Sequence, residues 1–264
     1  MIDEGFVRRY GSWAVVAGAS EGLGAAWAEA LAARGLNLVL IARRAEVLGA
    51  TAASIRSKHG VEVRPHAFDL AGPAFAAELE RLAADVEVGF AVFNAAHAPR
   101  GQFLELALED QLRSVDVNCR GPLTLAHVLG RRMAARGRGG LVLMSSLTAF
   151  NGSPFIATYG ATKAFNLVLG EGLWFELRAR GVDVLACAAG ATLTPGFRKA
   201  SPDGEPGMIE PEQVVEEALE RLGRAGVMIP GAFNRFASFL MRRVLPRRTA
   251  VAILGNRTRN LVLP

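Results

Sequence analysis

Tyr159 and Lys163 lie four residues apart in a segment with a helical pattern, and their types suit them to proton transfer. A spacing of four puts both side chains on one face of a helix. A phenol titrates at about pH 10, and a neighbouring ammonium favours its charged form. The pair therefore predicts general acid–base catalysis, with Tyr159 as the proton donor and Lys163 lowering its pKa.

Ser146 is a third candidate, because it ends a predicted strand thirteen residues before Tyr159. A hydroxyl there would point out of the carboxyl edge of the sheet, where open α/β folds bind ligands, and could donate to a substrate carbonyl oxygen. Ser145 is a rival from the residues alone. Asn118 falls inside a predicted helix over 104–136, where asparagine is mildly unfavourable, and its alternative is an exposed polar residue.

Gly18, Gly22 and Gly24 form a G-x3-G-x-G turn between the first predicted strand and an alanine-rich helix. Glycines allow a tight turn and a close backbone approach to a diphosphate. The helix N-terminus adds unpaired N–H groups and the positive end of a dipole. The turn therefore predicts a dinucleotide site in the first strand–helix unit.

Two arginines, Arg43 and Arg44, stand at the end of the second predicted strand, where no acidic residue occurs. An acidic residue there would hold a ribose 2′-hydroxyl, whereas arginine can hold a 2′-phosphate through charge-assisted hydrogen bonds. The pair favours NADP(H) over NAD(H), and its alternative is a solvated helix start. Asp69 and Leu70 follow the third strand, where Asp69 could contact the adenine, cap the next helix, or do both.

Short apolar runs alternate with helical patterns along the chain. Strands are expected at 13–17, 36–41, 61–68, 88–93, 141–145, 182–188 and 227–230, and helices at 22–34, 44–59, 72–84, 104–136, 157–180 and 211–224. Strands that are apolar on both faces are typical of buried parallel sheets. The alternation predicts an α/β, single-domain Rossmann fold, with a doubly wound seven-stranded parallel sheet and helices on both faces. The irregular stretch 190–210 is typical of a binding loop.

Length and composition exclude several classes of protein. A chain of 264 residues that is 51% hydrophobic and 21% charged is not disordered and suits one α/β domain. Cys119 and Cys187 form no disulfide framework, which fits a reducing compartment. The acidic N-terminus lacks a secretory signal, and no apolar run reaches the ~18 residues of a spanning helix, so a cytoplasmic location is expected. The histidines lack metal-ligand spacing, and no metal site is expected.

The positive charge is concentrated at the C-terminal end. The net charge is +5, but nine arginines and no acidic residue follow Glu220, so residues 1–220 carry −4. These arginines do not alternate with stacking aromatics in the way that nucleic-acid binding requires, and no nucleic-acid partner is expected.

The motifs together resemble the short-chain dehydrogenase/reductase family over residues 12–231. The family turn T-G-x3-G-x-G is matched from Ala17 to Gly24, with alanine in place of threonine. The N-N-A-G motif appears as Phe93–Ala96, and the P-G-x3-T motif appears at 189–194 without its proline. The segments 8–16 and 37–44 resemble the branch of 3-oxoacyl-CoA reductases and 17β-hydroxysteroid dehydrogenases.

The resemblance implies hydride transfer between a nicotinamide and a carbonyl carbon, with Tyr159 as general acid in reduction and general base in oxidation. It implies that Lys163 also bonds the nicotinamide ribose, that Ser146 polarises the carbonyl, and that Asn118 supports a water-linked proton relay. The implied catalytic tetrad is Asn118, Ser146, Tyr159 and Lys163. The implied cofactor-binding residues are Gly18, Ser20, Glu21, Gly22, Leu23, Gly24, Arg43, Arg44, Asp69, Leu70, Asn94, Ala95, Ala96, Tyr159, Lys163, Gly190, Thr192 and Thr194.

Apolar residues beside these motifs bear on the substrate. Substrate contacts are expected from His97, Ser146, Phe150, Phe155, Tyr159 and Phe197. An apolar lining favours a hydrophobic ketone, such as an acyl chain, an acyl thioester or a steroid-like ring system, although such residues can also be core. A lone histidine such as His97 is more often structural.

Residues 232–264 are expected to extend a catalytic domain of residues 1–231. The segment from Phe233 to Pro246 mixes aromatics with arginines at helical spacing. Three interpretations remain: contact with the inner membrane face, a dock for CoA or acyl-carrier phosphates, or packing on the domain or a partner with the arginines outward. The last is favoured.

The sequence thus favours an NADPH-dependent reductase of a hydrophobic carbonyl compound. The alternatives are an oxidative alcohol or hydroxysteroid dehydrogenase, and an NADP(H)-binding sensor or scaffold that has lost catalysis. The resemblance also implies a homodimer or homotetramer built through the helices at 104–136 and 157–180.

Overall fold

The computed structural model describes residues 3–194, 197 and 207–262, and seven strands lie within them. The strands are β1 (Trp13–Ala17), β2 (Asn37–Ala42), β3 (Val63–Ala67), β4 (Val88–Phe93), β5 (Gly139–Ser146), β6 (Val182–Ala189) and β7 (Val227–Met228). All neighbouring pairs are parallel, in the order β3-β2-β1-β4-β5-β6-β7. The predicted doubly wound, seven-stranded parallel sheet is confirmed.

The strand order reverses between β1 and β4, where the chain crosses from one half of the sheet to the other. Among the described residues, the α-helices that precede β7 are α1 (Glu4–Tyr10), α2 (Gly22–Ala33), α3 (Ala45–His59), α4 (Phe75–Leu82), α5 (Leu108–Val115), α6 (Gly121–Arg136), α7 (Ala157–Arg178) and α9 (Pro211–Arg221). Ligands of open α/β sheets bind beyond the carboxyl ends of the strands at such a reversal. The topology therefore directs the search for a site to the ends of β1 and β4.

The two faces of the sheet carry separate hydrophobic cores. On one face α2, α3 and α9 cover a cluster that includes Trp27, Leu48 and Val214. On the other face α4, α6 and α7 cover a cluster that includes Phe75 and Leu129. Successive strand residues point to opposite faces, so every central strand must be apolar throughout. This double burial explains the unbroken hydrophobic runs of the sequence.

The prediction of one continuous helix over 104–136 is wrong. Residues 104–107 are not helical, and the segment comprises α5, a π-helical turn over Asp116–Arg120, and α6. Asn118 sits in that π-helical turn and is fully buried, so its interpretation as an exposed residue is also wrong. Single π-helical turns within α-helices frequently occur at functional sites.

The third strand also differs from its prediction. It spans Val63–Ala67 rather than 61–68, lies at the edge of the sheet, and alternates in exposure instead of being buried on both faces. Pro65 pairs within it beside Leu40. A proline is tolerated here because only one side of an edge strand has a neighbour.

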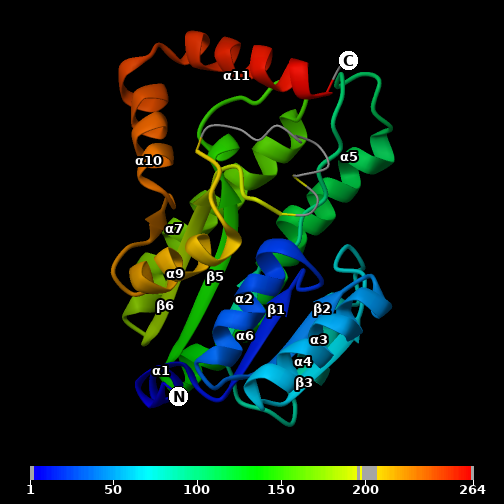
Figure 1. The fold of residues 1–264 in the computed structure, drawn as a ribbon, viewed down its shortest axis with the longest axis vertical. Coiled ribbons are helices and arrows are strands. Elements are labelled where there is room, and N and C mark those ends of the chain that lie inside the picture. Colours follow the sequence, from blue (N-terminus) through cyan, green and yellow to red (C-terminus); the bar gives the residue numbers. More distant parts are fainter. Residues whose placement is uncertain (1–2, 195–196, 198–206, 263–264) are drawn as a thin grey trace.

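The C-terminal residues form α10 (Ala232–Phe239), a π-helical turn at Leu240–Val244, and α11 (Arg247–Val262). Figure 1 shows α1 at one end of the molecule and α11 at the other, where α11 crosses beyond the carboxyl ends of the strands. The helical spacing read from Phe233 onward and the break at Pro246 are thus observed in the structure.

Candidate active site at the carboxyl edge of the sheet

A cavity of about 430 Å³ opens at the point where the strand order reverses. Its lining comes from the ends of β1, β2, β3 and β4 and includes Val117 from the π-helical turn. Ten of the predicted cofactor residues line it: Gly18, Ser20, Glu21, Arg43, Arg44, Asp69, Leu70, Asn94, Ala95 and Ala96. Motifs spread over almost eighty residues of sequence therefore meet at one place.

The glycines of the first turn are required by close packing. A Cβ on Gly18 would lie 2.5 Å from the backbone nitrogen of Ala95, and the residue has φ +87°. A Cβ on Gly24 would overlap the carbonyl oxygen of Gly18. The Asn94 amide donates to that same oxygen at 3.0 Å. The turn is thereby fixed against the end of β4, and its backbone stays open toward the cavity.

The two arginines after β2 have different surroundings. Arg44 is paired with the Glu21 carboxylate at 2.7 Å and lies 3.3 Å from the Ser20 hydroxyl. Arg43 is exposed in the cavity wall and has no hydrogen-bond or ion-pair partner among the described residues. Of the two, Arg43 is the guanidinium that is open to a bound anion.

Asp69 is anchored beside them. It accepts from the backbone N–H of Ala71 at 3.1 Å and pairs with Arg113 at 2.8 Å. Burial alone would raise the pKa of its carboxyl, but the hydrogen bonds from Arg113 and Ala71 outweigh this and hold the pKa below its usual value. The predicted helix cap is wrong, because the residue that precedes α4 is Ala74 and Asp69 caps only a local turn.

Ser146 and Tyr159 meet at the end of β5. Ser146 is its last residue, and its hydroxyl accepts from the backbone N–H of Thr148 at 3.2 Å. Burial raises the pKa of Tyr159, while a hydrogen bond with Ser146 and the positive charge of Arg100 act in the opposite direction. The neighbouring Ser145 is buried and donates to the Lys163 carbonyl oxygen at 2.7 Å, which leaves it in a structural role.

Lys163 is buried beneath Tyr159. Its Nζ lies 5.7 Å from the centre of the Tyr159 ring and donates to the Met144 carbonyl oxygen at 2.8 Å. Burial lowers the pKa of this ammonium to about 8. The predicted lowering of the Tyr159 pKa is not what the structure has: burial dominates there and raises the pKa.

Asn118 connects the end of β4 to the helix that carries Tyr159. Its Oδ1 accepts from the backbone N–H of His97 at 2.8 Å, and its Nδ2 donates to the His97 carbonyl oxygen at 2.8 Å. The same Nδ2 donates to Thr162 at 2.9 Å, and Thr162 donates to the Tyr159 carbonyl oxygen at 2.8 Å. The side chain therefore fixes α7 relative to the cavity, and its role in a proton relay stays a prediction.

The segment that follows β6 packs against the C-terminal extension. Thr192 donates to the Gly190 carbonyl oxygen at 3.2 Å and pairs in a bridge with Ile209, while Thr194 accepts from the backbone N–H of Phe197. A Cβ on Gly190 would lie 2.9 Å from the amide nitrogen of Asn234 in α10. Of the predicted binding loop 190–210, the structure describes residues 190–194, 197 and 207–210; residues 195–196 and 198–206 lie outside the described residues.

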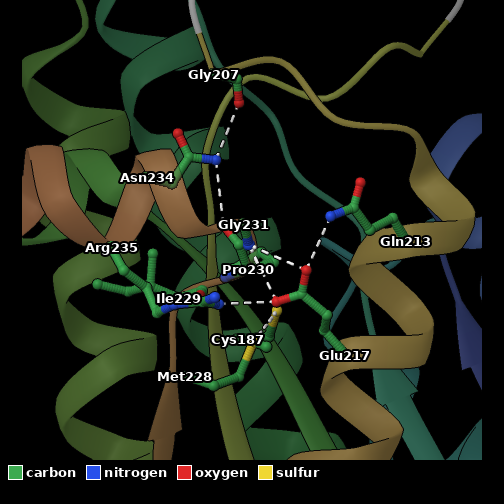
Figure 2. A network of polar contacts seen from close by, with 10 residues as sticks. All are labelled: Cys187, Gly207, Gln213, Glu217, Met228, Ile229, Pro230, Gly231, Asn234 and Arg235. Atoms are coloured by element: carbon green, nitrogen blue, oxygen red, sulfur yellow. Dashed lines mark hydrogen bonds and ion pairs between the residues drawn. The ribbon is translucent and has the colours of Figure 1, made fainter.

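Figure 2 shows how Asn234 is itself fixed. Its Nδ2 donates to the carbonyl oxygens of Gly207 at 3.0 Å and Pro230 at 3.1 Å. In α9, Glu217 accepts from the backbone N–H of Gly231 at 3.0 Å and from Arg235 at 2.9 Å. The start of α10 is therefore connected both to α9 and to the segment that follows β6.

The two aromatic residues near the catalytic pair contact the C-terminal extension, through the π-helical turn at Leu240–Val244 and through α11. Arg242 lies over the Phe150 ring at 3.9 Å, and Arg259 lies over the Phe155 ring at 5.6 Å. His97 is placed differently from these rings, because it lines the cavity with the predicted cofactor residues and lies 3.3 Å from Asp110.

Comparison with known protein families identifies the family to which this chain belongs. A family model described as short chain dehydrogenase matches residues 12–205. The chain belongs to the short-chain dehydrogenase family. This short-chain dehydrogenase is an oxidoreductase, in keeping with relatives that are named dehydrogenases and reductases.

Similar proteins act on steroids and on acyl chains. A 7β-hydroxysteroid dehydrogenase of Collinsella aerofaciens is 34% identical over 86% of this chain and 89% of its own length. A very-long-chain 3-oxoacyl-CoA reductase of Phaeosphaeria nodorum is 30% identical over 94% of this chain and 76% of its own length. The predicted resemblance to this branch is confirmed, and the hydroxysteroid relative is a 7β enzyme.

Solved structures extend the comparison to three dimensions. A chain from a structural study of 7β-hydroxysteroid dehydrogenase stereoselectivity is 31% identical, covers 94% of this chain and 98% of its own, and has a TM-score of 0.89. A short-chain dehydrogenase from Sphingobium yanoikuyae in complex with NADPH is 32% identical, with 96% of both chains covered and a TM-score of 0.75.

Three site residues escaped the sequence prediction. Thr162 links Asn118 to α7, Arg113 pairs with Asp69, and Arg100 acts electrostatically on Tyr159. Only Thr162 could have been found from the sequence, since it stands between Tyr159 and Lys163.

In the described part of this short-chain dehydrogenase, no helix has the length and apolar character needed to cross a bilayer.

Proposed function

We propose that this protein reduces the carbonyl group of a hydrophobic substrate to an alcohol with NADPH. Two observations support the proposal: Ser146, Tyr159 and the buried Lys163 lie together at the end of β5, and a cavity at the ends of β1–β4 is lined by Gly18, Ser20 and Glu21 of the glycine-rich turn. A proton donor and a phosphate-binding cavity at the same edge of the sheet suit hydride-transfer chemistry.

The lining of the cavity suits the diphosphate and the adenosine 2′-phosphate of NADP(H). The close packing at Gly18 and Gly24 leaves backbone, not side chains, facing the position of a diphosphate at the start of α2. Arg43 would hold the 2′-phosphate, because it is the arginine after β2 without a carboxylate partner among the described residues. NADPH in the similar Sphingobium enzyme supports this choice. The cofactor would supply the hydride.

The residues of the chain would supply the proton and the orientation. Tyr159 would donate its phenolic proton to the oxygen that forms at the reacting carbon, and its raised pKa keeps it protonated at neutral pH. Ser146 would donate a hydrogen bond to the same oxygen. Lys163 would place a positive charge below the ring and lower the cost of the tyrosinate that remains.

The substrate class follows from the relatives and the aromatic residues together. The similar Collinsella and Phaeosphaeria enzymes are named for a hydroxysteroid and a very-long-chain 3-oxoacyl-CoA. Phe150 and Phe155 lie in the segment between Ser146 and Tyr159, and would contact an apolar skeleton of either kind. Steroid-like ketones and 3-oxoacyl compounds are therefore the proposed substrates, with residues 1–231 as the catalytic domain.

A panel of such ketones with NADPH, followed by absorbance at 340 nm, tests the proposal. Tyr159→Phe should reduce turnover by at least a thousandfold and leave the affinity for NADPH within a factor of about three, because the phenol gives the proton and adds little cofactor binding. Arg43→Ala is the matched variant: it should weaken the affinity for NADPH at least tenfold and leave the affinity for NADH unchanged.

Wild-type turnover by Tyr159→Phe on a substrate of the native enzyme would contradict the mechanism. NADPH binding without turnover of any ketone would instead favour a sensor.

A further inference from the structure

Phe155 has a backbone conformation that its residue type disfavours. Its φ is +65°, and among the described residues it is the one residue other than glycine with a positive φ. A bulky side chain clashes with its own backbone in the left-handed region, so such a residue stays there only where its surroundings enforce it. Conformations of this kind cluster at functional sites. The contacts that hold Phe155 in place therefore bear on function.

The strained residue stands where the chain enters α7. Ile156 follows Phe155 and is the N-cap residue of this helix, which begins at Ala157. Tyr159 lies in the first turn of α7. The backbone has only two freely rotating dihedral angles per residue, so the φ of Phe155 sets the direction in which the next residues start. The conformation of Phe155 therefore determines where Tyr159 lies relative to Ser146.

The segment that follows β4 is docked on this turn. The backbone N–H of Gly101 donates to the Phe155 carbonyl oxygen at 2.9 Å. Pro99, Phe103 and Leu106 line, together with Phe155, a cavity of only about 10 Å³. A space of this size holds at most one water molecule. The segment 99–106 and the start of α7 are therefore closely packed.

A buried glutamine fixes the same contact from α5. Gln111 is 7% exposed, and its Nε2 donates to the Phe103 carbonyl oxygen at 3.1 Å. Its Oε1 accepts a hydrogen bond from the hydroxyl of Thr158, which lies in the first turn of α7. The docked segment is therefore attached to the start of α7 at two points, directly at Phe155 and through Gln111 at Thr158.

The docked segment also carries a positive charge that acts on the proposed proton donor. Arg100 directly precedes Gly101 and is exposed. Burial raises the pKa of Tyr159, and the charge of Arg100 acts in the opposite direction. The effect of a charge weakens with distance. Arg100 can therefore favour the ionised phenol only while the segment stays docked.

We propose that Phe155 is a positioning residue, whose left-handed backbone docks the segment 99–106 on the first turn of α7 and thereby fixes Tyr159 for proton transfer. The inference rests on the proposed function and deepens it, because the proton that Tyr159 donates belongs to that reaction. Phe155 would act through its backbone, which is a different role from the substrate contact expected of its ring.

Two substitutions separate the backbone of Phe155 from its ring. Phe155→Gly and Phe155→Val both remove the ring, but glycine adopts the left-handed conformation freely and β-branched valine resists it. Hydrogen exchange of the Gly101 amide, measured by NMR, reports the docking, and kcat with NADPH and a ketone reports the placement of Tyr159. Relative to Phe155→Gly, Phe155→Val should show about tenfold faster exchange and about tenfold lower kcat, with an affinity for NADPH within a factor of about three.

Phe155→Ala keeps the experiment decisive if the valine variant does not fold. Alanine lacks the β-branch but still disfavours a positive φ, so its exchange rate and kcat should lie between those of the other two variants. Values equal to those of Phe155→Gly would count against the proposal.

Phe150 provides the matched control, because it lies in the same segment between Ser146 and Tyr159 and has a φ of −86°. Phe150→Gly and Phe150→Val should therefore show equal exchange at Gly101. Equal exchange in the glycine and valine variants of Phe155 would overturn the docking role. Faster exchange in Phe155→Val without a lower kcat would overturn the positioning of Tyr159. A native enzyme that reduces no ketone would contradict the proposed function instead, and exchange at Gly101 would still decide the docking role.

Discussion

At the scale of a single residue, Lys163 carries a positive charge that the proposed chemistry uses and that burial disfavours. The side chain is 3% exposed, and its ammonium donates a hydrogen bond to the Met144 carbonyl oxygen. Taking an ammonium out of water disfavours its charged form, which is why its pKa is lowered to about 8. The group is then close to neutral at a pH only slightly above the physiological range.

We expect this titration to limit reduction at alkaline pH. Below about pH 8 Lys163 is charged, and above it the proton is lost. The phenol stays protonated over the same range because the pKa of Tyr159 is raised. The value of kcat/KM for reduction should therefore fall about tenfold per pH unit above pH 8. Lys163→Arg keeps its charge and should move the decline to higher pH. The pH profile of both enzymes measures this, and an identical decline in both would contradict it.

Residue types and spacing were enough to predict much of the site. Gly18, Arg43, Asn94 and other cofactor residues predicted from motifs line one cavity, because parallel strands bring their carboxyl ends to one edge. Spacing could not reveal that Asn118 lies in a π-helical turn, since its hydrogen-bond partners come from segments distant in sequence. It also could not predict that burial would dominate the pKa of Tyr159.

At the scale of elements, α10 is the connection between the extension and the rest of the site. Asn234 is 5% exposed and its amide fills the space between two glycines, Gly190 and Gly207, neither of which has room for a Cβ. Its hydrogen bonds end on carbonyl groups of Gly207 and Pro230. Helical spacing predicted this helix, but not its partners, because those contacts join residues that are not neighbours along the helix.

Asn234→Ala should therefore destabilise the protein. The change removes two hydrogen bonds and leaves two carbonyl groups without these partners, at a cost of about 2 kcal/mol. The free energy of unfolding from urea titration measures the loss. Asn256→Ala is the control, because Asn256 is exposed on α11, and it should change stability by less than about 0.5 kcal/mol. Equal effects of the two substitutions would show that the Asn234 contacts do not stabilise the fold.

At the scale of the whole molecule, one surface is unusually apolar. Along α5 and the residues before it, the exposed side chains include Leu104 at 94%, while on α7 they include Val168 and Phe175. Val168 also lines a shallow apolar groove on α7. Exposed apolar areas of this kind mark protein contacts. We propose that this surface joins copies of the chain into the homodimer or homotetramer that the resemblance implied.

Val168→Glu should weaken that assembly by placing a carboxylate in an apolar contact, at a cost of several kcal/mol. Size-exclusion chromatography with light scattering should show a smaller mass for this variant than for the native protein. Phe236→Glu introduces the same charge on α10 and should leave the mass unchanged, because Phe236 lies outside this surface. A monomeric native protein would contradict the proposal.

The opposite placement of α1 and α11 has a practical consequence for handling the protein. The Tyr10 ring in α1 packs against Gly140 near the start of β5, whereas α11 crosses the segment 150–156 at the other edge. Attachment to a solid support through the N-terminal end would leave the carboxyl ends of the strands, where the candidate site lies, facing the solution. A purification tag fused after α11 would extend from the helix that crosses beyond those strand ends, so immobilised reactors and ligand screens should use the N-terminal end.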